Sequence, residues 1–320
     1  MLGVAATAFH PDEPLNGLHV GDVPDAVVPD GWVRVAVRAA ALNHHDLWSL
    51  RGVGLREEQL PMVLGCDAAG VLDDGTEVVV HAVVGEPIDG DETMDPRRTL
   101  LSEKHPGTFA EHVAVPARNV VPKPPALSWE EAACLPTAWL TAYRMLFTMS
   151  GLRPGGRVLV QGAGGGVSTA LIALARAAGY RVWVTSRDET KRARAVELGA
   201  HEAFEPGARL PDRVDAVMET VGAATWDHSL KSLGPGGTVV VAGATSGSEP
   251  PADLKRVFFR QLRVVGSTMG TRGELDALVR FLDNTGVRPV VDSVRPMAEA
   301  RAAFERLAAG ESFGKLVLTT

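Results

Sequence analysis

The sequence is poor in cysteine and holds neither a long apolar run nor a basic block. It has two cysteines, Cys66 and Cys134, in 320 residues, which makes a disulfide framework implausible and fits a reducing cytoplasm. No 18-residue apolar run occurs, so we expect no membrane span. The formal net charge of −7 argues against nucleic-acid binding. The first residues, MLGVAATAFHPDEP, lack the basic and apolar regions of a signal peptide.

The length and the hydrophobic pattern indicate two domains. Residues 1–125 favour β-structure, with strands expected at Trp32–Val37, Val78–Val84 and Thr108–Val115. From Arg157 onward, short apolar strands alternate with helices, which is typical of a parallel, doubly wound sheet.

The segment Arg157–Ala200 is the most informative part of the chain. It reads RVLVQGAGGGVSTALIALARAAGYRVWVTSRDETKRARAVELGA, which predicts strand, glycine turn, helix and strand in succession. The helix N-terminus would offer free N–H groups and a positive dipole to a phosphate. The pattern departs from strict G-x-G-x-x-G, and its best register is Ala163, Gly165 and Ser168. A dinucleotide is therefore expected here, and a glycine-rich turn without a ligand is the alternative. The expected phosphate-binding residues are Gly162, Ala163, Gly164, Gly165, Gly166 and Val167.

The end of the second strand of this segment favours NADPH over NADH. An NAD site usually carries an acid there to bind the ribose 2′-hydroxyl. This sequence has Ser186 and Arg187 instead, with Lys191 four residues further on. A 2′-phosphate prefers a hydroxyl and cations, whereas a carboxylate would repel it. Asp188 and Glu189 fall in the first turn of the next helix, where acids favour the helix dipole. The alternative is that Arg187 and Lys191 are ordinary surface charges.

The order of several motifs resembles the medium-chain dehydrogenase/reductase family over essentially the whole chain. The resemblance is closest to its zinc-independent quinone oxidoreductase branch. The matching motifs, besides the glycine turn, are Asn43-His44-His45-Asp46, Leu64-Gly65-Cys66-Asp67-Ala68-Ala69-Gly70, Gly107-Thr108-Phe109-Ala110-Glu111, Thr141-Ala142-Tyr143 and Gly314-Lys315.

The resemblance implies an α/β protein with a GroES-like β-rich catalytic domain and a Rossmann domain. The Rossmann domain, residues 138–265, would be inserted into a catalytic domain formed by residues 1–137 and 266–320. It also implies further cofactor contacts, although each has an alternative as an ordinary turn residue. These implied contacts are Thr141, Thr220, Val221, Gly243, Ala244, Thr245, Ser267, Met269 and Lys315.

The same resemblance argues against a metal. Zinc-dependent relatives hold zinc at positions that match Asn43, Cys66 and approximately Thr137, and asparagine and threonine are poor zinc ligands. Residues 84–107, which match the structural zinc lobe, contain no cysteine. We therefore expect no metal. A non-standard site in which Cys66 gathers with His44, His45, Asp46 and Asp67 remains open.

Without zinc, a conjugated enone or a quinone is an easier hydride acceptor than an unactivated ketone, because the developing charge needs only oriented hydrogen-bond donors. The resemblance suggests Asn43 as such a donor, His45 as a proton donor and Trp48 as an aromatic wall of the substrate pocket. The alternatives are a turn-capping asparagine, a structural histidine and a core tryptophan.

The expected function is thus an NADPH-dependent, metal-free oxidoreductase acting on quinones or α,β-unsaturated carbonyl compounds. The alternatives are a zinc alcohol dehydrogenase with atypical ligands and an NADPH-binding sensor or structural protein with little turnover. A homodimer is expected as well, with the apolar segment Val257–Val265 as an edge strand that needs cover.

Overall fold

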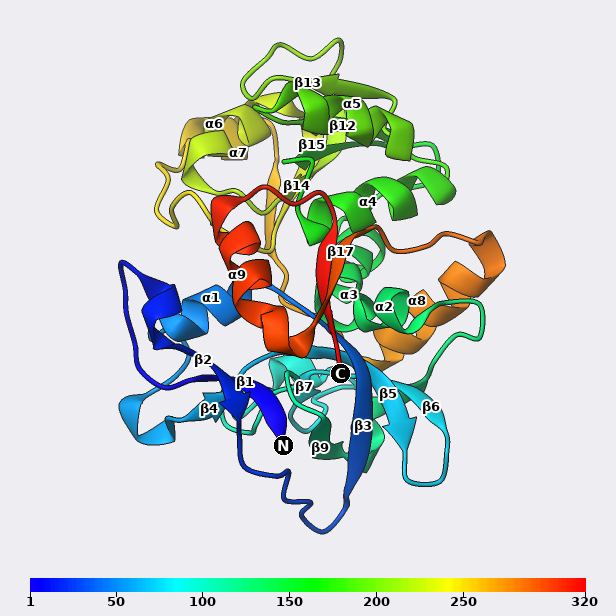
Figure 1. Cartoon of the computed structure of the whole chain (residues 1–320). Helices are drawn as coiled ribbons and strands as arrows, with labels where there is room; N and C mark the ends of the chain where they lie inside the picture. The colour runs from blue at the N-terminus through cyan, green and yellow to red at the C-terminus, as the bar shows by residue number, and fades with distance from the viewer. The chain divides into compact units, whose positions relative to one another are not determined.

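The computed structural model describes residues 1–320 as two compact units (Figure 1). One unit contains Met1–Leu140 and Met269–Thr320, and the other contains Thr141–Thr268. The assignment of 1–137 with 266–320 and of 138–265 as separate domains stays a prediction. None of the helices combines the length and the apolar character that a membrane span requires.

The unit Thr141–Thr268 is built on a six-stranded, wholly parallel sheet with strand order β13-β12-β11-β14-β15-β16. Its central strands are short apolar runs that are buried on both faces, as parallel sheets require. The strands are β11 (Arg157–Gln161), β12 (Arg181–Thr185), β13 (Glu202–Phe204), β14 (Val214–Glu219), β15 (Leu233–Val241) and β16 (Arg263–Gly266).

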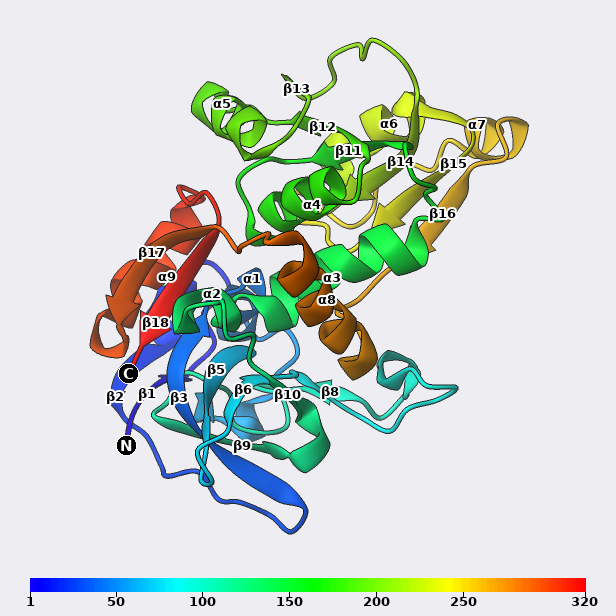
Figure 2. The same ribbon diagram turned by 90° about the vertical axis from the view of Figure 1, so that its right-hand side faces the viewer.

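The strand order reverses between β11 and β14, so right-handed crossovers place successive helices on opposite faces of the sheet. In Figure 2 α4 lies on one side of these strands, and α6 and α7 lie on the other. A reversal of this kind marks the ligand-binding edge of doubly wound sheets. The helices are α4 (Gly166–Ala177), α5 (Glu189–Leu198), α6 (Ala223–Ser232) and α7 (Leu254–Phe259), with the π-helical turn η6 (Arg144–Met149) ahead of them.

The other unit is rich in antiparallel strands. Its largest sheet has the order β10-β6-β5-β3-β18-β17, with β9 also paired to β3, and two smaller sheets contain β2-β1-β4 and β7-β8. The strands are β1 (Leu2–Ala6), β2 (Leu18–Asp22), β3 (Trp32–Ala41), β4 (Met62–Val63), β5 (Asp67–Leu72), β6 (Glu77–Val80), β7 (Val83–Val84), β8 (Thr99–Leu100), β9 (His112–Pro116), β10 (Val120–Pro122), β17 (Val291–Pro296) and β18 (Lys315–Thr319).

Helices and short helical turns connect and cover these strands. A capping box opens α2, because the Ser128 hydroxyl accepts from the Glu131 N–H and the Glu131 carboxylate accepts from the Ser128 N–H. The α-helices are α1 (His44–Leu50), α2 (Trp129–Ala133), α8 (Arg272–Thr285) and α9 (Ala300–Ala309), with α3 (Leu140–Tyr143) at the junction of the two units. The shorter turns are η1 (Pro14–Gly17), η2 (Glu57–Gln59), η3 (Glu92–Met94), η4 (Ala117–Asn119), η5 (Leu135–Trp139) and η7 (Met297–Glu299).

The ends of the chain meet in this unit, since β18 pairs with β3 in the register Val317 to Ala41. Figure 2 shows red β18 beside blue β3. The shared core contains residues from both ends, including Val35, Leu64, Phe109, Phe304 and Leu316. The α/β fold class, a β-rich unit with a doubly wound parallel-sheet unit, is thus as predicted.

Three expected strands are corrected. The segment Val78–Val84 is divided into β6 and β7, because the His81 N–H donates to the Asn119 carbonyl and leaves the strand ladder. The segment Thr108–Val115 becomes a strand only at His112, since the Thr108 and Phe109 N–H groups bond to the loop carbonyls of Gly65 and Leu64.

The third correction concerns Val257–Val265, which is not one strand. Residues 254–259 form α7, whose N-cap is Asp253: its carboxylate accepts from the Arg256 N–H. Only Arg263–Gly266 is extended, as β16 at the edge of the parallel sheet. The apolar content suggested a strand, but the local cap determines a helix.

Candidate functional site

The glycine turn follows β11 directly and leads into α4. Gly162 has φ of +85°, a conformation that favours glycine, and its N–H lies 3.4 Å from the Thr185 hydroxyl of the neighbouring strand. Gly165 is the N-cap of α4 and has no side chain to block the first N–H groups of the helix. The turn therefore exposes backbone donors at the positive end of a 12-residue helix, which is the arrangement that binds a diphosphate.

The end of β12 presents the residues expected to select the nucleotide. Ser186 is partly exposed and its hydroxyl accepts from the Asp188 N–H, while Arg187 is exposed. Asp188 is the N-cap of α5, which accounts for this acid without a role in cofactor binding. Arg192, which sequence reasoning missed, donates to the Ser186 carbonyl at 2.7 Å and so fixes the turn. Its place one turn into a basic helix was the available signal.

The turns after β14 and β15 lie against each other. The Ser246 N–H and hydroxyl both donate to the Val221 carbonyl at 2.7 Å, and the Thr245 N–H donates to the Thr220 carbonyl at 3.4 Å. A Cβ on Gly243 would lie 3.0 Å from the Thr220 carbonyl oxygen. The structure thus brings together five expected cofactor-binding residues, which are Thr220, Val221, Gly243, Ala244 and Thr245.

A buried carboxylate at the end of β14 supports one of these turns. Glu219 is fully buried, and its carboxylate accepts from the Val221 and Gly222 N–H groups and from the Thr225 and Ser229 hydroxyls. All these donors are neutral. The position of Glu219 at the end of an apolar strand was a signal for a satisfied buried acid.

In the β-rich unit, Asn43, Asp67 and Lys315 form a buried cluster. The Lys315 ammonium donates to Asn43 Oδ1 at 2.6 Å, to the Leu42 carbonyl at 2.7 Å and to Asp67 Oδ2 at 3.0 Å. The Asn43 amide donates to Asp67 Oδ2 at 2.9 Å and to the Ala41 carbonyl at 3.3 Å. The expectation that Asn43 offers a free donor is therefore corrected, because both of its N–H bonds are directed into the protein.

In this cluster the Lys315 ammonium is directed at protein groups. Its side chain is 3% exposed and all three ammonium donors have a partner. The N–H groups expected to contact a cofactor thus stabilise the buried carboxylate of Asp67, at a site built from β3, β5 and β18. A direct cofactor contact by Lys315 stays a prediction.

A second cluster joins Cys66, His45 and Glu103. His45 Nδ1 lies 3.7 Å from Cys66 Sγ, and His45 Nε2 lies 3.2 Å from Glu103 Oε1. The Cys66 thiol donates to the Leu101 carbonyl at 3.2 Å. Burial opposes the charge on His45, but the contacts with Cys66 and Glu103, together with nearby Asp46, raise the pKa of His45 well above its usual value.

The pKa values of the thiol and the two carboxyl groups near His45 are shifted in different directions. Burial raises the pKa of the Cys66 thiol, although its contacts with His45 and Ser102 act in the opposite direction. Burial works against the ionised form of Glu103, yet hydrogen bonds from His45, Leu100 and Thr99 lower the pKa of Glu103. Burial also raises the pKa of Asp46 to about 6, although its carboxylate accepts from two backbone N–H groups.

These residues do not fit a zinc ion. Two residues stand at positions that match zinc ligands. The side chain of Asn43 is hydrogen-bonded to Asp67 and Lys315. Cys66 contacts Nδ1 of His45, whose Nε2 faces Glu103. The open possibility of a site that gathers His44, His45, Asp46 and Asp67 around Cys66 is corrected: Asp46 binds backbone N–H groups and Asp67 binds Lys315. No three acidic, histidine or cysteine side chains are arranged to hold a metal.

The remaining expected site residues lie in separate places. Trp48 is half-buried in α1, and Thr141 is buried in α3. Ser267 follows β16, whereas Met269 packs with Cys66, Ala82 and Val83 in the other unit. The roles of Trp48, Thr141, Ser267 and Met269 stay predictions.

Comparison with known proteins identifies the family to which the chain belongs. Residues 29–125 match the model of the alcohol dehydrogenase GroES-like domain, and residues 166–284 match that of zinc-binding dehydrogenases. A zinc-type alcohol dehydrogenase-like protein of Schizosaccharomyces pombe is 31% identical over 93% of both chains. The chain belongs to the medium-chain dehydrogenase/reductase family. It is thus an oxidoreductase of that family.

Further family members with different activities resemble the chain. An acryloyl-coenzyme A reductase of Metallosphaera sedula is 30% identical over 95% of this chain and 97% of the relative. A crystal structure of an NAD-dependent alcohol dehydrogenase matches all of both chains at 36% identity with a TM-score of 0.92. The relatives named here thus include an acryloyl-coenzyme A reductase as well as alcohol dehydrogenases.

Proposed function

We propose that this oxidoreductase transfers hydride from NADPH to a quinone or an α,β-unsaturated carbonyl compound without a metal. The observation that carries the proposal is the Lys315 ammonium, which lies 2.6 Å from Asn43 Oδ1. Asn43 stands where zinc-dependent members have a ligand. A fixed ammonium at this point repels a divalent cation and already neutralises the carboxylate of Asp67.

The proposed nucleotide site combines the glycine turn with the end of β12. Gly162, Gly164, Gly165 and Gly166 leave room for a diphosphate, and the α4 N-terminus supplies donors. Ser186, Arg187 and Lys191 would bind the 2′-phosphate that distinguishes NADPH from NADH. When bound, NADPH supplies the hydride.

The substrate class follows from what the β-rich unit offers. In a ketone or aldehyde without conjugation the negative charge develops on a single oxygen, which is harder to stabilise with the residues present, since they do not fit a zinc ion. In an enone or quinone the negative charge spreads from carbon to oxygen, so a proton donor and oriented dipoles suffice. His45 is the proposed proton donor, since its imidazolium is favoured by its neighbours. The acryloyl-coenzyme A reductase relative is named for an acceptor of this conjugated type.

A substrate screen with both nucleotides tests the proposal. We expect NADPH oxidation with quinones and enones, little turnover of simple alcohols or aldehydes, and a marked preference for NADPH over NADH. Stoichiometric zinc in the purified protein, together with turnover that a chelator abolishes, would instead establish the zinc alcohol dehydrogenase. Absence of turnover with every acceptor, despite NADPH binding, would indicate a sensor or structural protein.

A homodimer is proposed from a separate observation. The edge strand β16 has no further partner strand, and Val264 on it is 50% exposed. Just before it, Leu254, Phe258 and Phe259 on α7 are 69%, 69% and 79% exposed. An apolar, unpaired edge of this kind needs cover, and a second copy of the same edge supplies it. We expect light scattering to give the mass of a dimer and F259E to shift it toward a monomer; a monomeric wild type would oppose this proposal.

A further inference from the structure

A buried hydrogen-bond network crosses the parallel-sheet unit and is centred on Gln161, the last residue of β11. The Gln161 amide oxygen accepts from the Thr185 hydroxyl at 2.6 Å. The amide nitrogen donates to the Ser229 hydroxyl at 2.9 Å and to His228 Nδ1 at 3.0 Å. Both donors and the acceptor oxygen of this side chain therefore have partners, from β12 on one side and from α6 on the other.

The direction of each bond in the network follows from the carboxylate at its end. Because a carboxylate only accepts, the Ser229 hydroxyl gives its proton to Glu219 Oε2 at 2.5 Å and can only accept from Gln161. The Gln161 nitrogen must then face α6 and its oxygen must face β12, which excludes the flipped amide. His228 Nδ1 accepts as well, so the proton of the neutral ring lies on Nε2, which donates to the Ala208 carbonyl at 2.9 Å.

The network ends at the backbone of the two turns that are expected to bind the nucleotide. At one end the Gly162 N–H of the glycine turn lies 3.4 Å from the Thr185 hydroxyl. At the other end the Glu219 carboxylate accepts from two N–H groups of the turn after β14, at 2.8 and 3.0 Å. Gln161 thus connects the turn after β11 to the turn after β14, on the two sides of the point where the strand order reverses.

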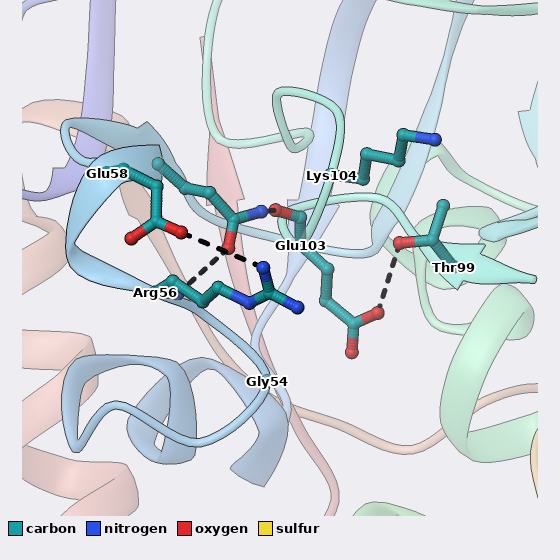
Figure 3. Close-up of a pocket in the computed structure, with 7 residues that line it drawn as sticks. Gly54, Arg56, Glu58, Thr99, Glu103 and Lys104 are labelled. Carbon is teal, nitrogen blue, oxygen red and sulfur yellow. Dashed lines mark hydrogen bonds and ion pairs between the residues drawn. The ribbon is translucent and has the colours of Figure 1, made fainter.

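Water cannot replace the members of this network, because they are buried. Thr185 is 1% exposed, and Gln161, Ser229 and Glu219 are fully buried. A solvated group behaves differently: the Glu103 carboxylate of the β-rich unit lines a surface pocket with 25% of its side chain exposed, so water can take the place of a lost partner there (Figure 3). A break in the buried network instead leaves a polar group without a partner, and the turn that depends on it loses its fixed position.

We propose that Gln161 is a positioning residue that holds the two turns at a fixed spacing, so that both halves of NADPH are bound at once. This rests on the proposed function, which places the 2′-phosphate at the end of β12 and the diphosphate at the glycine turn after β11. Because β11 lies between β12 and β14 in the sheet, the nicotinamide half then extends over the turn after β14. A ligand that binds at two points gains its full affinity only when the two points are preorganised.

The test breaks the network in its middle and compares a two-point ligand with a one-point ligand. Q161M replaces the amide with an apolar side chain of the same length and leaves Thr185 beside the glycine turn and Ser229 beside Glu219. By titration calorimetry we expect the Kd for NADPH to rise about tenfold, as for a lost buried hydrogen bond. Adenosine 2′,5′-bisphosphate reaches from β12 to the glycine turn only and should keep its wild-type Kd. The matched control is V184A, which removes buried methyl groups from β12 without touching the network and should keep the ratio of the two Kd values.

A pair of variants at Thr185 keeps the proposal testable if Q161M does not fold. T185V removes the hydroxyl and keeps the shape of the side chain, so NADPH should bind more weakly, whereas T185S keeps the hydroxyl and should bind NADPH as the wild type does. A Q161M protein with the wild-type Kd for NADPH, equal weakening of both ligands in Q161M, or a T185V protein that binds NADPH as tightly as T185S overturns the positioning role alone. A wild type that binds neither NADPH nor the bisphosphate overturns the proposed function itself.

Discussion

Two buried carboxylates, one in each unit, are stabilised in opposite ways. Asp67 is fully buried in the β-rich unit and relies on a cation, the Lys315 ammonium at 3.0 Å. Glu219 is fully buried at the end of β14 and relies on backbone N–H groups and hydroxyls alone. One acid is neutralised by an opposite charge, and the other is surrounded by dipoles.

The two modes of stabilisation correspond to two structural roles, one in shaping a turn and the other in fixing strands. The dipoles around Glu219 belong to the turn at Val221 and Gly222, so the acid sets the shape of a backbone that is expected to bind a nucleotide. The charge opposite Asp67 comes from a distant strand, so this pair fixes the positions of three strands at the point where relatives hold a metal. One substitution at Lys315 removes the whole counter-charge of Asp67, whereas no single substitution removes all four neutral donors to Glu219.

The largest expected effect tests the charged member of the comparison. K315M leaves Asp67 as a buried, unpaired acid, and breaking a buried pair in this way costs about 3–5 kcal/mol. We expect the free energy of unfolding in urea to fall by about that amount. The double variant D67N/K315M removes both charges and should recover much of the loss. If the two single losses simply add in the double variant, the pair is not coupled and the contrast with Glu219 disappears.

A substitution of Glu219, which is stabilised by neutral donors, should lower the free energy of unfolding less. E219Q replaces two acceptor oxygens with one oxygen and one NH₂ group, so at least one buried donor loses its partner at a cost of about 1–3 kcal/mol. We expect a smaller loss of unfolding free energy than in K315M, together with weaker NADPH binding measured by fluorescence titration. S229A removes one of the hydroxyl donors to Glu219, together with the acceptor of the Gln161 amide, and keeps the carboxylate, so it is the milder control. A loss in E219Q equal to that in K315M would break the distinction between charge and dipoles.

The smallest effect on stability, but a selective one on binding, is expected at the edge of the nucleotide site. R187A removes an exposed guanidinium and should leave the unfolding free energy unchanged. One charge-assisted hydrogen bond is worth about 1.5–3 kcal/mol, so we expect the Kd for NADPH to rise about tenfold or more and that for NADH to stay the same. R153A, an exposed arginine ahead of β11, should change neither constant. Equal weakening of both nucleotides in R187A would count against NADPH selectivity.

Local patterns in the sequence predicted the parallel-sheet unit well. The predicted succession of strand, glycine turn, helix and strand is present as β11, the turn, α4 and β12. The signals there are short-range: an apolar run, a turn that needs glycine and an amphipathic or apolar helix. Where two local signals competed, as at Val257–Val265, the helix cap at Asp253 prevailed over the apolar content.

The polar clusters of the β-rich unit could not be derived in the same way. Lys315 meets Asn43 and Asp67 across 272 and 248 residues of sequence, and His45 meets Glu103 across 58 residues. Each contact joins segments that are far apart in the sequence and meet only in the folded unit, which no local pattern encodes. The sequence therefore indicated Asn43, His45 and Lys315 as candidates, but not that two of them bind one another or that Glu103 lies behind the third.

The place of β18 in the chain has a consequence for synthesis. Because Lys315 begins this strand, Asp67 has no counter-ion until the ribosome has made residue 315. The parallel-sheet unit is one continuous segment and can assemble earlier, whereas the first 140 residues must stay incomplete until the last strand arrives. A nascent chain arrested before residue 315 should thus contain one finished unit and one that chaperones still recognise.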